Sequence, residues 1–191
     1  MKLISFEQNG SNRIGAIENG FIYDFHSIDS NISDSMLGFL QGGEVQMNLA
    51  NKAIDGGKTS IPVDSIKLLS PLSNPPSVRD AYAFRQHVAT ARKNRGLEMI
   101  PEFDEIPIFY FTNHNAVFGP GNFPVLKRHT EKLDFELECA AIIGKGGRNI
   151  SVSEADNYIT GFMIMNDFSA RGLQMQEMKL NLGPAKGKDF G

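Results

Sequence analysis

The first 25 residues alternate between short apolar runs and turn signals. Three strand-like runs, at residues 2–8, 13–18 and 21–25, are separated by Asn9-Gly10 and Asn19-Gly20. Asn-Gly is the strongest short hairpin signal, because both central residues of the turn take a positive φ. The pattern therefore predicts a small β-meander at the N-terminus.

Two further features divide the chain. Residues 34–54 predict two short helices that are broken at Gly42-Gly43. Residues 68–78 (LLSPLSNPPSV) are rich in Pro and Ser and form the best candidate for a junction. We therefore expect a small N-terminal β-rich domain over residues 1–70 and a main domain over residues 71–191.

The main domain opens with a helical pattern. Residues 78–96 (VRDAYAFRQHVATARKNRG) predict one helix that stops at Gly96. One face of such a helix would carry four residues at intervals of three or four: Asp80, Phe84, His87 and Ala91. Asp80 and His87 would then lie roughly 10 Å apart along the axis. That spacing suits a metal ligand and a base on opposite sides of a small substrate, although spacing alone favours an ordinary, half-exposed histidine.

Strand signals dominate the rest of the chain. The apolar runs at residues 106–112 and 162–170 each predict a strand, and Gly-Pro-Gly at residues 119–121 predicts a turn. The last strand carries Asp167. Residues 151–161 predict a short helix with Ser153 as its N-cap, Asp156 at its third position and Gly161 at its end. This mixed, strand-rich order predicts an α+β fold with a largely β core.

Residues 132–144 (KLDFELECAAIIG) predict a strand with two chemically different faces. Asp134, Glu136 and Glu138 occupy alternate positions and therefore share one face. The opposite face carries only apolar residues: Leu133, Phe135, Leu137 and Cys139. Cys139, the only cysteine of the chain, cannot form an internal disulfide, and we expect it to be a small buried hydrophobe.

The acidic face has two interpretations. Spacing alone favours a half-exposed strand with its polar face in water. However, like charges on a shared face are destabilising, and no Lys or Arg is interleaved to relieve them. Clustered carboxylates also suit a hard divalent ion such as Mg²⁺ or Ca²⁺, with Asp167 as a candidate third ligand. For Arg171 and Lys188, the simplest interpretation from sequence is a solvated surface charge.

Composition excludes several classes of protein. The 191 residues carry a net charge of -3, which argues against a nucleic-acid or acidic-membrane partner. We see no signal peptide and no stretch long enough to span a membrane, so we expect a soluble cytoplasmic protein. The segment GPAKGKD lacks P-loop spacing, and neither zinc-ligand spacing nor a G-x-S-x-G elbow is present.

Four motifs taken together are more specific than any one of them. In chain order they are RDAYAFRQH, LDFELE followed by AAIIGK, GFMIMNDFSARGLQMQE, and GPAKGKDFG. Over residues 70–191 this series closely resembles the fumarylacetoacetate hydrolase family, and the N-terminal meander resembles the small domain of its longer members. The resemblance implies a mostly-β mixed β-sandwich roll.

The resemblance also assigns roles to individual positions. It implies four metal ligands: Glu136, Glu138, Asp167 and Asp80. It implies a general base at His87, a substrate contact at Tyr82, and residues that hold the substrate and stabilise developing charge at Arg171, Gln174 and Lys188. On this basis Asp134 lies near the metal without binding it.

The implied activity is hydrolysis of a carbon–carbon bond in a 1,3-diketo acid of the fumarylacetoacetate or acylpyruvate type, as in aromatic amino acid catabolism. Mg²⁺, or alternatively Mn²⁺ or Ca²⁺, would chelate the two oxygens and keep the departing enolate until it is protonated. His87 would activate the attacking water, while Lys188 and Gln174 stabilise the oxyanion. Two alternatives stay open: a decarboxylase or isomerase of oxaloacetate-like keto acids, and an inactive, truncated homologue.

Two departures from the family pattern matter. Gly172 stands where the family usually has Asp, which removes one carboxylate near the site. The family's domain also continues well past the position of Lys188, so we expect an incomplete catalytic domain with unpaired sheet edges. The family further implies a homodimer and a small keto-acid substrate.

Overall fold

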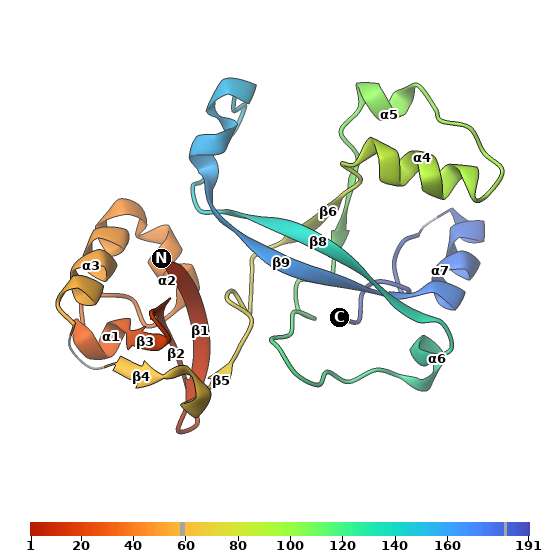
Figure 1. Cartoon of the computed structure of the whole chain (residues 1–191). Coiled ribbons are helices and arrows are strands. Elements are labelled where there is room, and N and C mark those ends of the chain that lie inside the picture. The colour runs from red at the N-terminus through yellow and green to blue at the C-terminus, as the bar shows by residue number, and fades with distance from the viewer. Residues whose placement is uncertain (58–59, 182) are drawn as a thin grey trace.

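The computed structural model describes residues 1–57, 60–181 and 183–191. Over these residues the strands form a five-stranded sheet in the order β4-β3-β2-β1-β5 and two two-stranded sheets, β6-β7 and β8-β9. The five-stranded sheet and its helices form one group, and the two smaller sheets lie beyond it (Figure 1). Within the described part of the chain, no helix is both long and apolar enough to cross a lipid bilayer.

The N-terminal meander is confirmed. Its sheet consists of β1 (Lys2–Gln8), β2 (Ser11–Glu18), β3 (Phe21–Asp24), β4 (Ser60–Pro62) and β5 (Lys67–Leu68), all antiparallel. Asn9 and Asn19 have φ angles of 52° and 51°, as the two Asn-Gly turns require. The sequence analysis did not identify β4 and β5, which are only three and two residues long.

Three helices cover this sheet and enclose its core. They are α1 (Phe25–Ile28), α2 (Met36–Gln41) and α3 (Gly43–Asp55), and the predicted break falls at Gly43, whose φ is 55°. Phe25, predicted as the last residue of a strand, instead begins α1, because the Asp24 side chain accepts a hydrogen bond from the Ser27 backbone. Phe25 then stacks on Phe39 with ring centroids 5.5 Å apart in the core.

The predicted helix over residues 78–96 is wrong in its first part. Val78–Ala81 is strand β6, which pairs with β7 (Phe109–Thr112), and only Arg85–Lys93 forms a helix, α4. The partner strand lies about 30 residues further along the chain, and its pairing outweighs local helical preference. Asp80 and His87 therefore do not share a helix face. The short helix α5 (Glu102–Glu105) lies between α4 and β7, whereas the 3₁₀ segment η1 (Val63–Ser65) links β4 to β5 in the N-terminal sheet.

The acidic strand and the second apolar strand form a long curled pair (Figure 1). They are β8 (Leu133–Ile143) and β9 (Ile159–Ala170), preceded by α6 (Lys127–Thr130) and followed by α7 (Arg171–Glu177) and η3 (Met178–Leu180). The predicted helix between them is the 3₁₀ helix η2 (Val152–Tyr158). Its N-cap is Ser151 rather than Ser153, and Gly161 belongs to β9, because this strand starts two residues before it.

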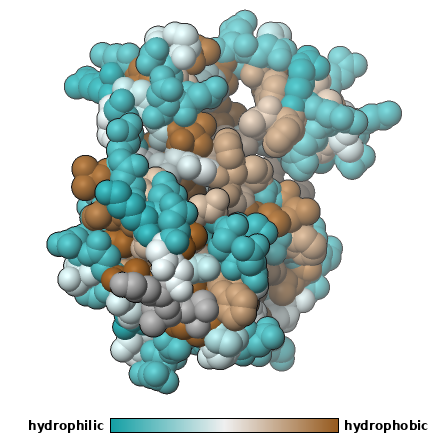
Figure 2. Space-filling view, turned by 60° about the vertical axis from the view of Figure 1, so that its left-hand side comes forward, coloured by the Kyte–Doolittle hydropathy of each residue, from teal (hydrophilic) through white to brown (hydrophobic). Residues whose placement is uncertain are grey.

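The apolar face of the β8-β9 pair is open, which corrects the expectation for Cys139. Cys139 is exposed, and Leu137 and Ile164 keep 71% and 75% of their surfaces accessible. Phe123 packs on Phe168 at one end of this face, but most of the face stays accessible, so its alternation does not bury Cys139. Hydrophobic side chains also reach the surface elsewhere, in patches between hydrophilic ones (Figure 2). The complete β-sandwich roll stays a prediction.

Candidate functional site

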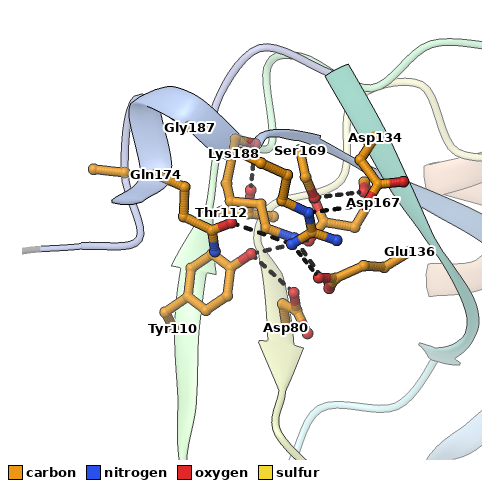
Figure 3. Close-up of polar contacts among 12 residues, drawn as sticks. Asp80, Tyr110, Thr112, Asp134, Glu136, Asp167, Ser169, Gln174, Gly187 and Lys188 are labelled. Carbon is orange, nitrogen blue, oxygen red and sulfur yellow. Dashed lines mark hydrogen bonds and ion pairs between the residues drawn. The ribbon is translucent and has the colours of Figure 1, made fainter. Parts of the chain in front are cut away.

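Four carboxylates converge where the two small sheets meet. Asp80 comes from β6, Glu136 and Glu138 from β8, and Asp167 from β9. Each offers one oxygen, and these four oxygens all lie within 4.8 Å of one another. In Figure 3 the carboxylate of Asp80 points toward the hydroxyl of Tyr110 and toward the side of the site where Glu136 and Asp167 lie.

Strand geometry explains the convergence. Glu136 lies directly opposite Asp167 in the antiparallel ladder, and Glu138 follows on the same face two residues later. Asp80 is directly opposite Tyr110 in the other sheet, so β6 and β7 also direct polar groups inward. Asp167 is 6% exposed, which places the centre of the cluster away from solvent.

Two cations border the acids. The ammonium group of Lys188, which is 3% exposed, pairs with Asp167 and lies 3.0 Å from Glu136 Oε2. Arg171, at the start of α7, donates from Nη1 to Glu136 Oε1 at 2.7 Å and from Nε to Asp134 Oδ2 at 3.0 Å. Asp134 thus binds an arginine beside the cluster rather than joining it, as the sequence analysis expected.

Gln174 and Arg171 occupy one turn of α7 beside the acids. Arg171 Nη1 donates to Gln174 Oε1 at 3.1 Å as well as to Glu136, so the arginine lies between Gln174 and Glu136 (Figure 3). Arg171 and Lys188 are therefore not simple solvated surface charges, since both have carboxylate partners at the site.

Tyr110 is a site residue that the sequence analysis missed. Its hydroxyl oxygen lies 2.8 Å from Asp80 Oδ2 and 3.2 Å from Asp167 Oδ2, so its single proton is shared between two carboxylates of different sheets. The signal was present, because alternation along β7 separates Tyr110 and Thr112 from Phe109 and Phe111.

The crowding of negative charge shifts several ionisation equilibria. Burial, reinforced by the charges of Asp80 and Asp167, raises the pKa of Glu138 to about 7. Burial also raises the pKa of Asp167 to about 6, although the hydrogen bond from Lys188 opposes this effect. Burial acts in the same direction on Glu136, but hydrogen bonds from Arg171 and Lys188 outweigh it and lower the pKa of Glu136. Burial and both neighbouring aspartates raise the pKa of Tyr110.

His87 and Tyr82 lie apart from these contacts. Both are exposed, and their rings meet edge to face with centroids 6.4 Å apart. Among the hydrogen bonds and ion pairs of the described residues, none joins His87 or Tyr82 to the four acids. The general-base role of His87 and the substrate contact of Tyr82 stay predictions.

The donor set fits a divalent cation. All four candidate ligands are carboxylates, and hard ions such as Mg²⁺, Mn²⁺ and Ca²⁺ prefer oxygen ligands. Histidine and cysteine, which zinc commonly uses, are missing from this cluster. Burial first, and then the negative charges of neighbouring acids, raise the pKa values of Glu138 and Asp167, and a divalent cation would offset both effects.

Comparison with known proteins identifies the class to which this fold and site belong. The model of the fumarylacetoacetate (FAA) hydrolase C-terminal family matches residues 77–191. The chain therefore belongs to the fumarylacetoacetate hydrolase family.

Individual relatives agree with this assignment. The chain is 27% identical over 181 residues to the oxaloacetate tautomerase fahd2, mitochondrial, of Xenopus laevis, covering 93% of this chain and 54% of that protein. Among solved structures, a fumarylacetoacetate hydrolase from Exiguobacterium antarcticum matches with a TM-score of 0.67 at 28% identity, covering 99% of this chain and 62% of that one. The chain thus spans about half the length of the curated relatives that it matches.

A third comparison bears on the fold alone. The maleylpyruvate hydrolase from Sphingobium sp. SYK-6, solved with manganese(II) ion and pyruvate, matches with a TM-score of 0.67 at 19% identity. It covers 90% of this chain and 60% of that chain. The FAH-like fold, with mixed α and β content and a curled antiparallel sheet, is therefore shared with solved relatives.

Proposed function

We propose that this protein acts on small keto acids with a 1,3-dicarbonyl arrangement and uses a divalent cation held by Asp80, Glu136, Glu138 and Asp167. The observation that carries this proposal is the meeting of four carboxylate oxygens within 4.8 Å. Mg²⁺ is the first candidate, with Mn²⁺ and Ca²⁺ as alternatives. The Sphingobium maleylpyruvate hydrolase, which shares the fold, was solved with manganese(II) ion and pyruvate, and we take its divalent ion and small keto acid as the model for this proposal.

The chain's own residues suit an anionic keto acid. When bound, the cation would supply Lewis-acid polarisation of the substrate oxygens. Arg171 presents a planar array of N–H donors that matches a carboxylate. Lys188 holds an ammonium group among the acids, where it can stabilise negative charge that develops on a substrate oxygen. Gln174, hydrogen-bonded to Arg171, can orient the same substrate through its amide.

Hydrolysis of a carbon–carbon bond is our first candidate reaction. Its support is the family, together with the Exiguobacterium fumarylacetoacetate hydrolase at 28% identity. In this reaction His87 removes a proton from the water that attacks the carbonyl carbon. His87 lies on exposed α4, so the reaction requires α4 to bring this imidazole toward the acids on substrate binding.

Isomerisation of an oxaloacetate-like keto acid is the second candidate. The Xenopus oxaloacetate tautomerase, aligned over 93% of this chain, favours it. The exposed position of His87 also favours it, because moving a proton between carbon and oxygen needs no attacking water. Decarboxylation of the same substrates belongs with this candidate, because it too develops charge on the keto-acid oxygens.

Two absorbance assays separate the candidates. An acylpyruvate is followed in the ultraviolet with Mg²⁺, with EDTA and after Glu136→Ala, and the products are analysed. Metal-dependent loss of the diketone signal that His87→Asn abolishes would establish hydrolysis. Retained acylpyruvate, with faster keto–enol exchange of oxaloacetate or release of CO₂, would establish the second candidate. Metal binding without turnover of either substrate would instead indicate a non-catalytic homologue.

The remaining expectations also belong to this proposal. They are a domain division near residue 70, assembly as a homodimer, and a cytoplasmic location. Analytical ultracentrifugation tests the second directly.

A further inference from the structure

Lys188 reaches the acids on a loop that comprises residues 183–191. The last residue of β9 and Asn113, which directly follows β7, hold this loop from one side. The Ala170 backbone N–H donates to Gly187 O at 2.8 Å, and Asn113 Nδ2 donates to Asp189 O at 2.8 Å. The loop has no helix or strand of its own over these residues, so its position depends on such outside contacts.

Helix α7 holds the loop from the other side at very short range. A β-carbon added to Gly187 would lie 2.8 Å from Gln174 Cβ and 2.9 Å from Gln174 N. Only glycine therefore allows the loop backbone to approach the helix this closely at that position. The contact places the residue before Lys188 directly against the helix that carries Arg171 and Gln174.

Glu177, the last residue of α7, provides the polar part of this contact. Its Oε1 accepts hydrogen bonds from the Ala185 backbone N–H at 2.8 Å and from the Gly187 backbone N–H at 3.1 Å. A single carboxylate oxygen thus binds two N–H groups of an irregular segment. Hydrogen bonds to a charged acceptor are roughly twice as strong as neutral ones.

We propose that Glu177 is a positioning residue, whose carboxylate holds the 183–191 loop so that the Lys188 ammonium group reaches Glu136 and Asp167. Glu177 lies outside the four-acid cluster, and its described partners are loop backbone groups. The part of this inference that concerns catalysis rests on the proposed function. The part that concerns the position of Lys188 does not.

A second contact, between His129 and Phe190, holds the end of the 183–191 loop independently of Glu177. The His129 ring is buried and stacks on Phe190 with centroids 4.2 Å apart, and its Nδ1 accepts a hydrogen bond from the Leu126 N–H at 3.3 Å. This contact ties down the far end of the loop from α6. Loss of the Glu177 contact should therefore loosen the segment around residues 185–188 without releasing the whole loop.

Two measurements on the full chain test the inference, and neither needs a cation or a substrate. Hydrogen exchange followed by mass spectrometry compares the peptide containing residues 183–190 with a β9 peptide. Acetylation by acetic anhydride compares Lys188, which is 3% exposed, with exposed Lys52 on α3 as an internal reference. The variants are Glu177→Ala, Glu177→Gln, and Gln176→Ala as the matched control on the same helix.

We expect Glu177→Ala to speed exchange at the two bonded amides and acetylation of Lys188 by about tenfold or more, as loss of charged hydrogen bonds implies. Exchange in β9 and acetylation of Lys52 should stay unchanged. Glu177→Gln, which keeps an acceptor oxygen, should restore most of the protection, and Gln176→Ala should resemble wild type. If Glu177→Ala also speeds exchange in β9, the comparison is made between Glu177→Gln and Glu177→Asp, whose shorter carboxylate should protect the loop less.

The outcomes separate this inference from the proposed function. Protection of Lys188 in Glu177→Ala equal to that in wild type would overturn the positioning role, whatever the enzyme assays show. An unprotected Lys188 in Glu177→Ala, in a chain without turnover of any keto acid, would support the positioning role while the proposed function fails. Where wild type does turn over substrate, Glu177→Ala should lower kcat with Glu177→Gln restoring it.

Discussion

Glu136 and Asp167 face each other directly across the β8-β9 ladder, and the ammonium group of Lys188 pairs with both. Like charges at directly opposed positions destabilise an antiparallel pair. Lys188, which lies 21 residues after Asp167, compensates this repulsion. The stability of the β8-β9 pair and the position of the 183–191 loop are therefore coupled through this ion pair.

This relationship predicts the effect of removing the ammonium group. Lys188→Met leaves two partly buried carboxylates facing each other without a cation, so we expect the free energy of unfolding to fall by about 3 kcal/mol. Added Mg²⁺ should recover part of the loss. Thermal unfolding followed by circular dichroism, with and without Mg²⁺, provides the measurement. Lys186→Met, an exposed neighbour in the same loop, is the control, and an equal loss in both variants would contradict the compensating role of Lys188.

The two carboxylates of β8 that flank Glu136 should differ in their effect on metal binding. Glu138 belongs to the four-acid cluster, whereas Asp134 pairs with Arg171. We expect Glu138→Gln to weaken Mn²⁺ binding by about tenfold or more, since a charged ligand is lost, while Asp134→Asn changes it much less. Electron paramagnetic resonance of free Mn²⁺ gives both dissociation constants. If both variants lost Mn²⁺ affinity to a similar extent, Asp134 would have to be counted among the metal ligands.

The raised pKa values of Glu138 and Asp167, about 7 and about 6, predict an unusual pH dependence. Both groups hold their protons more tightly in the folded chain than in the unfolded one. Their contribution to stability is therefore complete at low pH and is lost as the pH rises through these values. In EDTA, we expect the melting temperature to fall between about pH 5 and about pH 8.

Mg²⁺ should reverse this trend, because a cation binds the deprotonated carboxylates and its affinity rises with pH. Differential scanning fluorimetry across the pH range, with EDTA or Mg²⁺, tests both statements. Glu138→Gln serves as the control, since removing one titrating group should flatten the curve measured in EDTA. A melting temperature that rises steadily with pH in EDTA would refute the prediction.

Replacing Gly187 or Gly172 by alanine should change the stability in opposite directions, because only Gly187 lies tightly against α7. Gly187→Ala places a methyl group 2.9 Å from Gln174 N, so we expect a loss of about 1–3 kcal/mol in stability and weaker protection of Lys188. Gly172 lies within α7 with open space around it, so Gly172→Ala should be neutral or stabilise by up to about 1 kcal/mol. Urea denaturation measures both. A Gly187→Ala variant as stable as wild type would show that the loop can move off the helix.

The fold was predictable from sequence where local signals decide it. The two Asn-Gly turns fixed the meander, since they require positive φ whatever surrounds them. The segment at Asp80 was predicted as a helix because β6 owes its conformation to β7, a partner whose position no local pattern reveals. Cys139 was predicted to be buried because alternation identifies an apolar face, but it does not reveal whether another element covers that face.

The same distinction applies to the site. Alternation placed Glu136 and Glu138 on one face, Asp167 and Asp80 were candidate ligands from their own segments, and the family resemblance implied all four, which the structure brings into one cluster. The network around Lys188 was not predictable, because it depends on how a loop, a helix end and two strands meet in space. Tyr110 could have been found, because alternation along β7 places it on the opposite face from Phe109 and Phe111, but the apolar composition of the segment drew attention away from its hydroxyl.

The order of the site residues along the chain has a consequence for biosynthesis. The ribosome makes the four acids first, then Arg171, and Lys188 only afterwards. The contacts of Lys188 with Glu136 and Asp167 form only after the residues between them have been made and the loop has closed. A nascent chain that has emerged only as far as β9 therefore gathers its negative charges without their counterion. Such a chain should remain open around the four acids until the Lys188 loop has docked or a cation has bound.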